Sequence, residues 1–184
     1  MRGWQIGTLN AWRRPPMGEY AALPASAGPV CWTGYVGPDD IDENGHMNVK
    51  SYDRIMENAD MAFFYDMGWT PAYPQQEAKG YFRVEKHVRY QAELLEGTPI
   101  CVTAWLAATD GKRFHLFFQL WNRSDGRRSA TMETMLLHMD LTTRRPAPIP
   151  DNAQSRAWNA LLETQKGVPV PEGLGRRVSM DRQD

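Results

Sequence analysis

The 184-residue chain has few cysteines, no long apolar run and no excess of charge of one sign. Cys31 and Cys101 stand in no metal-binding or redox motif, so we expect reduced core residues rather than a disulfide. No stretch approaches ~18 apolar residues, so no transmembrane helix is expected, and the first ten residues lack the apolar segment of a secretory signal peptide. The formal net charge is -1 and the sequence contains no basic block, so nothing indicates binding to nucleic acid or to an anionic membrane. These absences favour a cytoplasmic protein.

The length is that of one domain with its own core. Residues 1–29 are rich in proline and have no sustained period, so we expect a loosely ordered N-terminal arm. Its tryptophans, Trp4 and Trp12, leave two interpretations: the arm docks on its own domain, or it caps a partner subunit. Residues 30–150 are predicted to form the domain, and residues 151–184 a short C-terminal helix followed by a mobile tail.

One helix dominates the pattern. Asn48 is a good N-cap and Gly68 a good C-terminal residue for a helix over residues 49–67. Steps of three and four residues place apolar side chains on one face of this helix: Tyr52, Ile55, Met56, Ala59, Phe63 and Met67. A cluster of acidic, amide and histidine side chains precedes it. Because a helix N-terminus offers unpaired N–H donors, the sequence predicts a site there that polarises a carbonyl group.

The remaining elements are mostly strands. Short hairpin turns at Asp110-Gly111 and Asp125-Gly126 require antiparallel neighbours. We expect a short strand at residues 30–36, long strands at 81–90, 100–109, 113–121 and 129–141, and a helix at 153–164 with Asp151 as its N-cap.

Alternation within residues 81–90 predicts two faces for that strand. Arg83 falls on the polar face. Lys86 falls on the apolar face, and the sequence offers no reason for it.

The string Asp40-x-Asp42-x-x-Gly45-His46-x-Asn48, leading into a helix with Tyr52, resembles the acyl-CoA thioesterases of the hotdog fold, the 4-hydroxybenzoyl-CoA thioesterase-like group. The resemblance covers roughly residues 30–141. Four shorter strings resemble the betainyl-CoA thioesterases of carnitine breakdown more closely: Asn44-Gly45-His46-Met47-Asn48, Val84-Glu85-x-His87, Lys112-Arg113-x-His115-Leu116-Phe117 and Met135-Leu136-Leu137-His138.

The resemblance implies an α+β hotdog fold, in which a curved antiparallel sheet wraps a long central helix and a short C-terminal helix follows. It implies hydrolysis of a small acyl-CoA thioester, with betainyl-CoA as a candidate, by a homodimer or a dimer of dimers. No metal is expected, because His87, His115 and His138 lack ligand spacing. No cofactor is implied.

Asp42 matches the acidic residue of many such thioesterases, as general base or as direct nucleophile; the alternative is a solvated loop aspartate. Glu57, on the predicted helix, is the alternative candidate for the catalytic acid, or it forms an ion pair with Arg54. His46 orients the acid, acts as the base itself, or bonds the loop backbone.

Asn48 is either only the helix cap or, as the resemblance implies, also orders the site. The N–H group of Val49 is the candidate that polarises the thioester carbonyl. Tyr52 and Trp69 are the aromatic candidates for substrate contacts. A quaternary ammonium group needs an aromatic cage. Tyr65, Trp69, Tyr73 and Trp105 are available for one or are core residues, and the sequence does not assign a cage. Lys112 and Arg113 either bind CoA phosphates or are solvated turn charges, and the same two interpretations apply to Arg123, Arg127 and Arg128.

Two other functions remain open from the residues. A hotdog dehydratase would pair His46 with Glu57 to remove an α-proton from an acyl thioester. A binding module would hold acyl-CoA without turning it over, but such a module has no need of two acids beside the carbonyl.

Overall fold

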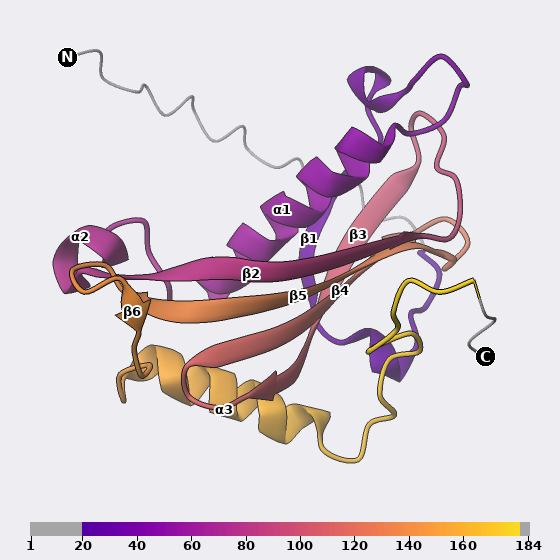
Figure 1. Ribbon diagram of the computed structural model, residues 1–184. Helices are drawn as coiled ribbons and strands as arrows, with labels where there is room; N and C mark the ends of the chain where they lie inside the picture. Colours follow the sequence, from indigo (N-terminus) through magenta and orange to yellow (C-terminus); the bar gives the residue numbers. More distant parts are fainter. Residues whose placement is uncertain (1–19, 181–184) are drawn as a thin grey trace, which may run out of the picture.

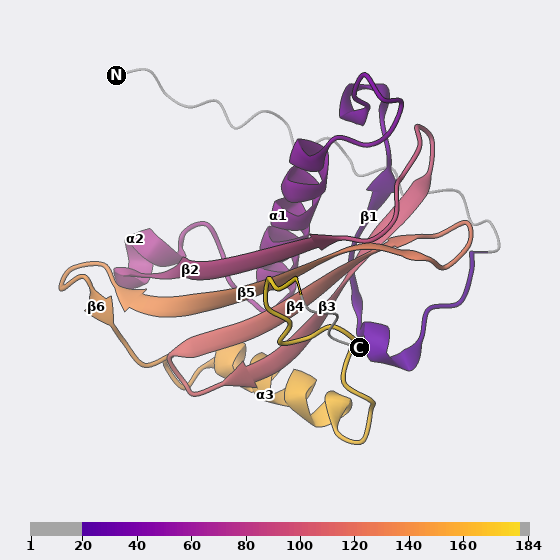
Figure 2. The same cartoon turned by 45° about the vertical axis from the view of Figure 1, so that its right-hand side comes forward.

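The computed structural model describes residues 20–180. One long helix, α1, packs against a strongly curled antiparallel sheet, and a shorter helix, α3, lies near the C-terminus (Figures 1 and 2). The strand order is β1-β3-β4-β5-β2, with β6 paired to β5. The elements are β1 Val30–Tyr35, α1 Val49–Asp66, α2 Tyr73–Glu77, β2 Lys79–Tyr90, β3 Pro99–Thr109, β4 Arg113–Asn122, β5 Arg128–Asp140, β6 Arg145–Pro146 and α3 Ala153–Gln165, with short 3-10 turns at Ala25–Ala27 and Pro38–Asp40.

Helix α1 forms as its sequence predicts. The Oδ1 atom of Asn48 accepts the N–H of Lys50 at 2.9 Å and so caps the first turn. The chain leaves the helix at Gly68 with φ +88°, a conformation that costs glycine little. The predicted apolar face lies against the inner side of the sheet, where Met56 and Ala59 are fully buried. This helix carries the core and holds the residues at its N-terminus in place.

The three hairpin strands β3, β4 and β5 pair antiparallel, as predicted. They form the middle of the sheet, which leaves β1 at one edge and β2 at the other. Strand β2 is 12 residues long, and its free edge has no partner in the described part of the chain.

A β-bulge in β2 corrects the predicted faces of this strand. The register against β5 shifts between Arg83 and Glu85, so that Val84 is the extra residue. An extra residue reverses the alternation, and Arg83 and Lys86 therefore both reach α1. The prediction that Arg83 lies on the other face is wrong. Lys86, unexplained from sequence, binds Asp53 and Glu57 of the helix.

Helix α3, at the bottom of Figure 1, covers the end of the core that α1 leaves open. Its N-cap is Asn152, which accepts the N–H groups of Gln154 and Ser155, so the prediction of Asp151 is wrong by one residue. Trp158 is 1% exposed, and its ring lies 4.3 Å from that of Phe114.

Chain segments at both ends of the described residues lie on the outer face of the sheet, which is the face turned away from α1. Of the predicted arm, residues 1–19 fall outside the described residues. The part that follows docks on its own domain, where the amide of Gln119 donates to the carbonyl oxygens of Ser26 and Ala27. The predicted mobile tail also crosses this face (Figure 2). Its Gly175 N–H donates to Glu133 at 2.9 Å, so this part of the tail is bound to the sheet.

No helix within residues 20–180 has the length and apolar character needed to span a membrane.

Candidate active site

The loop before α1 is held by its own backbone and by one buried carboxylate. Ile41 and Met47 form an isolated β-bridge, and the N–H of Asp42 donates to the carbonyl oxygen of His46 at 3.0 Å. Asp40 is 7% exposed; it accepts the Gly37 N–H at 3.0 Å and forms an ion pair with Arg54. Burial raises the pKa of Asp40, but these hydrogen bonds outweigh it and bring the pKa below its usual value. Asp40 therefore positions the loop.

Asp42 lies at the rim of a cavity of about 460 Å³ at the N-terminus of α1. Its Oδ1 atom accepts the N–H of Asn44 at 2.9 Å, which fixes the side chain within the turn. Val49, the first residue of the helix, also lines the cavity. No acceptor for the Val49 N–H is found among the described residues. One cavity thus combines a carboxylate with a free backbone donor at a helix N-terminus, where a developing negative charge is stabilised.

His46 lines the same cavity, and its Nε2 atom lies 3.1 Å from Oε2 of Glu93. Glu93 comes from the segment between β2 and β3, and sequence reasoning missed it. No local pattern marks this glutamate, because it meets His46 only through the packing of the loop: the Met47 N–H donates to the carbonyl oxygen of Leu94 at 2.8 Å.

Tyr52 forms the inner wall of the cavity. Its hydroxyl donates to the carbonyl oxygen of Ala92 at 3.0 Å, and its ring meets Tyr90 edge to face, with the centroids 5.3 Å apart. Burial, with the nearby charge of Glu93, raises the pKa of Tyr52 to about 12. Tyr52 is therefore a neutral side chain that, together with exposed Tyr90, gives the cavity an aromatic side.

Glu57 is placed elsewhere. It forms ion pairs with Arg83 and Lys86 of β2, and the expected pair with Arg54 is wrong because Arg54 binds Asp40. Burial raises the pKa of Glu57, but the two cations outweigh it and bring the pKa below its usual value. Eight residues into α1, Glu57 lies ~12 Å from Val49 along the axis and does not line the cavity.

Arg83 also binds a second, buried carboxylate of α1. This carboxylate belongs to Asp60, which is 4% exposed and retains one oxygen atom without a partner. Burial raises the pKa of Asp60 to about 6 despite the arginine. This network joins α1 to β2 and lies away from the loop.

Three other predicted residues are not brought to the cavity within one chain. Trp69 follows the far end of α1, where its ring stacks on Tyr65 with the centroids 5.6 Å apart. Lys112 and Arg113 lie at the β3–β4 turn, where Arg113 pairs with Asp110. Along β5 this turn is about seven residues from the end near Tyr90, or ~23 Å.

No three metal-binding side chains gather at one point within residues 20–180. Cys31 and Cys101 are both free thiols, as predicted.

The sequence profile of the thioesterase-like superfamily matches residues 36–157. The chain belongs to this family, and its curled sheet around α1 is the hotdog fold. It is 31% identical over 143 residues to the betainyl-CoA thioesterase of Pseudomonas aeruginosa, covering 78% of this chain and 89% of that protein. It is 27% identical over 186 residues to an L-carnitine dehydrogenase/betainyl-CoA thioesterase of Rhizobium meliloti. That match covers 98% of this chain and spans only 37% of the relative's length.

Solved structures give the same fold. A Staphylococcus aureus protein determined in complex with CoA superposes with a TM-score of 0.77 at 28% identity, covering 88% of this chain and 99% of that one. A DHNA-CoA thioesterase from Staphylococcus aureus has a TM-score of 0.63 at 15% identity, covering 73% of this chain and 90% of that one, and so supports the fold alone.

Proposed function

We propose that the protein is an acyl-CoA thioesterase that hydrolyses a small acyl-CoA to the free acid and CoA. The observation that carries the proposal is the cavity at the start of α1, where the carboxylate of Asp42 and the unpaired N–H of Val49 lie together. Thioester hydrolysis needs these two elements: a base or nucleophile, and a donor for the oxyanion.

In the proposed reaction, the thioester carbonyl oxygen lies at the Val49 N–H. Asp42 takes a proton from water as the water oxygen attacks the carbonyl carbon, and the tetrahedral oxyanion is held by that N–H. The C–S bond then breaks, and the CoA thiolate takes up the proton that Asp42 received. Direct attack by Asp42 would form an anhydride that water cleaves afterwards. In either route His46, held by Glu93, orients the reacting groups at the cavity.

We propose betainyl as the acyl group, because the Pseudomonas aeruginosa relative is named a betainyl-CoA thioesterase. A quaternary ammonium is attracted to aromatic faces and to carboxylates. The cavity offers Tyr52 and Tyr90 with Asp42 and Glu93, whereas Trp69 lies at the far end of α1.

We propose a homodimer formed through β2. Its long free edge presents unpaired backbone groups, and pairing with a second β2 would satisfy them. Antiparallel self-pairing would place the Lys79 end of one β2 beside the Tyr90 end of the other. The turn with Lys112 and Arg113, which lies at the Lys79 end of the sheet, would then approach the cavity of the second copy.

The dehydratase alternative is less well supported, because Glu57 is bound to Arg83 and Lys86 and does not share the cavity with His46. A cytoplasmic location stays a prediction.

The test is free-thiol release from a panel of acyl-CoAs: betainyl-, acetyl-, benzoyl- and medium-chain. We expect turnover, with betainyl-CoA preferred. Turnover confined to another acyl group would reject the acyl assignment and keep the reaction. No thiol release from any substrate, with hydration of an enoyl-CoA instead, would reject hydrolysis.

A further inference from the structure

Four arginines lie on the outer face of the sheet. Arg89 comes from β2, Arg128 from β5, and Arg176 and Arg177 from the C-terminal tail. None of them forms an ion pair with a carboxylate within residues 20–180. We call these four residues the arginine cluster.

The hydrogen bonds of Arg128 all go to neutral acceptors. Its guanidinium donates to the side-chain oxygens of Gln91 at 3.1 Å and Gln119 at 2.8 Å, and to the backbone carbonyl of Glu172 at 2.9 Å. Burial lowers the pKa of Arg128, the carboxylate of Glu172 raises it, and the like charge of Arg89 lowers it to a smaller extent. The fold therefore holds the like charges of Arg89 and Arg128 close together, with the carboxylate of Glu172 also near Arg128.

Gly173 shows how closely three of these arginines approach one another. A Cβ atom on Gly173 would lie 2.8 Å from Nη1 of Arg89, 3.9 Å from Nη2 of Arg128 and 4.0 Å from Cδ of Arg176. Any side chain there would displace the Arg89 guanidinium, and the backbone at φ +87° also favours glycine. The tail is thus shaped to leave room for these guanidinium groups.

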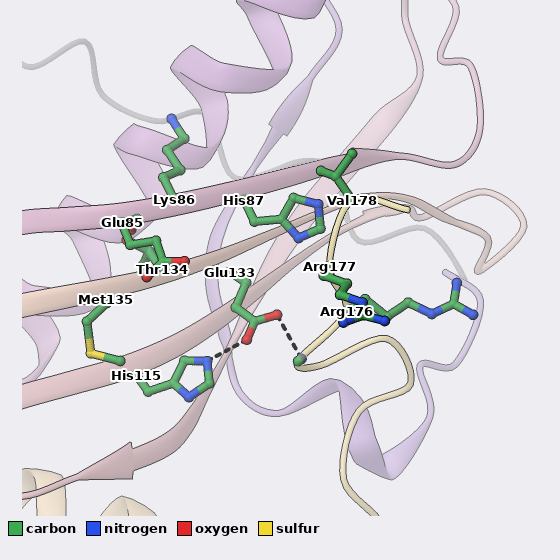
Figure 3. Close-up of a pocket in the computed structure, with 11 residues that line it drawn as sticks. Glu85, Lys86, His87, His115, Glu133, Thr134, Met135, Arg176, Arg177 and Val178 are labelled. Carbon is green, nitrogen blue, oxygen red and sulfur yellow. Dashed lines mark hydrogen bonds and ion pairs between the residues drawn. The ribbon is translucent and has the colours of Figure 1, made fainter. Parts of the chain in front are cut away.

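The tail and the sheet enclose a cavity of about 490 Å³ beside the cluster. Figure 3 shows Arg176 and Arg177 on the tail segment that crosses the sheet at one side of this cavity. Of its acids, Glu133 is already bonded to His115 at 2.5 Å and to the Gly175 N–H. Glu85 is the only other acid in the lining.

The cluster borders the candidate active site. Gln91 lines the cavity of Asp42 and also accepts the hydrogen bond from Nε of Arg128. A substrate whose thioester lies at Val49 would therefore reach the outer face by passing the end of β2 at Gln91. Arginine suits phosphate there, because its planar fork can donate two hydrogen bonds to one phosphate group.

We infer that the arginine cluster binds the phosphate groups of CoA, with the pantetheine arm running past Gln91 to the catalytic cavity. This inference rests on the proposed function. It assigns the phosphates to the same chain that supplies Asp42, rather than to the turn with Lys112 and Arg113.

The test compares two cluster variants, Arg89→Gln and the double variant Arg176→Gln/Arg177→Gln. The double variant changes only the tail, so it keeps the test valid if Arg89→Gln fails to fold. The matched control is Arg156→Gln, which removes an exposed arginine of α3 whose partner is Asp151. Calorimetry measures binding of desulfo-CoA, adenosine 3′,5′-bisphosphate and pantetheine, none of which requires turnover.

We expect each cluster variant to bind desulfo-CoA and the bisphosphate at least about ten-fold more weakly, since a hydrogen bond to a charged group is lost. Pantetheine binding should not change. In turnover, KM for the acyl-CoA should rise with kcat unchanged, and the same acyl group on pantetheine should be hydrolysed equally by all variants. Arg156→Gln should match the wild type in every assay.

Dissociation constants for desulfo-CoA within two-fold of wild type in both cluster variants would overturn the inference. Weaker desulfo-CoA binding that appears only in the double variant Lys112→Gln/Arg113→Gln would also overturn it. Bisphosphate binding that is lost in the cluster variants but does not compete with acyl-CoA would also overturn it, and would point to a site for a free nucleotide. Weaker desulfo-CoA binding together with no thiol release from any acyl-CoA would support the site and reject the proposed function.

Discussion

Replacing Val49 by proline removes the proposed oxyanion donor and little else. Val49 is the first residue of α1, a position where proline is favoured because its missing N–H has no partner in the helix. The residue before a proline must be extended, and Asn48 already is, with φ −65° and ψ 144°. The Val49 side chain is 56% exposed, so its loss leaves no cavity in the core.

The expected effect is therefore on catalysis rather than on folding. Loss of one oxyanion donor typically costs ~2.7–4 kcal/mol, or ~10²–10³ in kcat. A compatible proline changes the free energy of unfolding by only ~0.4–1 kcal/mol, and in the stabilising direction. Val49→Pro should thus lose ~10²–10³ in kcat while its denaturation midpoint stays at or slightly above that of the wild type.

The assay is thiol release at saturating acyl-CoA, with urea denaturation of each variant. The matched control is Val49→Ala, which keeps the N–H and shortens the side chain. A kcat for Val49→Pro close to that of Val49→Ala, with both proteins folded, would refute the role of this N–H. The oxyanion would then have to be held by another donor.

Three further predictions concern acids and the core. Asp42→Asn should lower kcat by ~10²–10⁴ with little change in the melting temperature. Glu57→Gln should retain activity because Glu57 lies outside the cavity. Thiol-release assays in which only Glu57→Gln is inactive would instead place the catalytic acid on the helix. Burial raises the pKa of Asp60 from its ordinary value of 3.8 to about 6. Between these two pH values the folded protein keeps a proton on Asp60 that the unfolded chain has released. The contribution of Asp60 to stability should therefore fall through this window as pH rises, and Asp60→Asn should gain up to ~3 kcal/mol relative to wild type between pH 3.5 and 7.5. Denaturation curves for the two proteins whose difference is independent of pH would contradict this. Phe63→Ala should cost ~3–5 kcal/mol, because the ring is 2% exposed and meets Phe118 edge to face at 5.8 Å, and a denaturation midpoint near wild type would contradict its place in the core.

The sequence was a reliable guide wherever structure follows from neighbouring residues. The helix from Val49 was predicted from its cap and its apolar spacing, and the hairpins from their Asp-Gly turns. Both signals act over a few residues. The same reasoning failed in β2, because the alternation rule assumes a regular strand. The bulge at Val84 adds one residue, and whether a strand contains a bulge is decided by its pairing with β5.

For the site, the sequence supplied the loop and the helix start, since Asp42, His46, Asn48 and Val49 lie within eight residues. It did not supply Glu93, which reaches His46 from 47 positions away. It also misplaced the partner of Glu57: the helical i,i+3 rule favours Arg54, but a neighbouring strand offers two cations and the loop offers Arg54 the carboxylate of Asp40.

The sequence by itself thus determined the family, the long helix α1, and the loop of acidic, amide and histidine side chains that immediately precedes this helix. Only the tertiary structure decided that Lys112 lies at the far end of the sheet from Asp42, and that Arg89, Arg128 and Arg176 converge on Gly173. The physical reason is distance along the chain. Short-range patterns fix local backbone geometry, whereas the meeting of β2, β5 and the tail depends on how the whole sheet curls around α1.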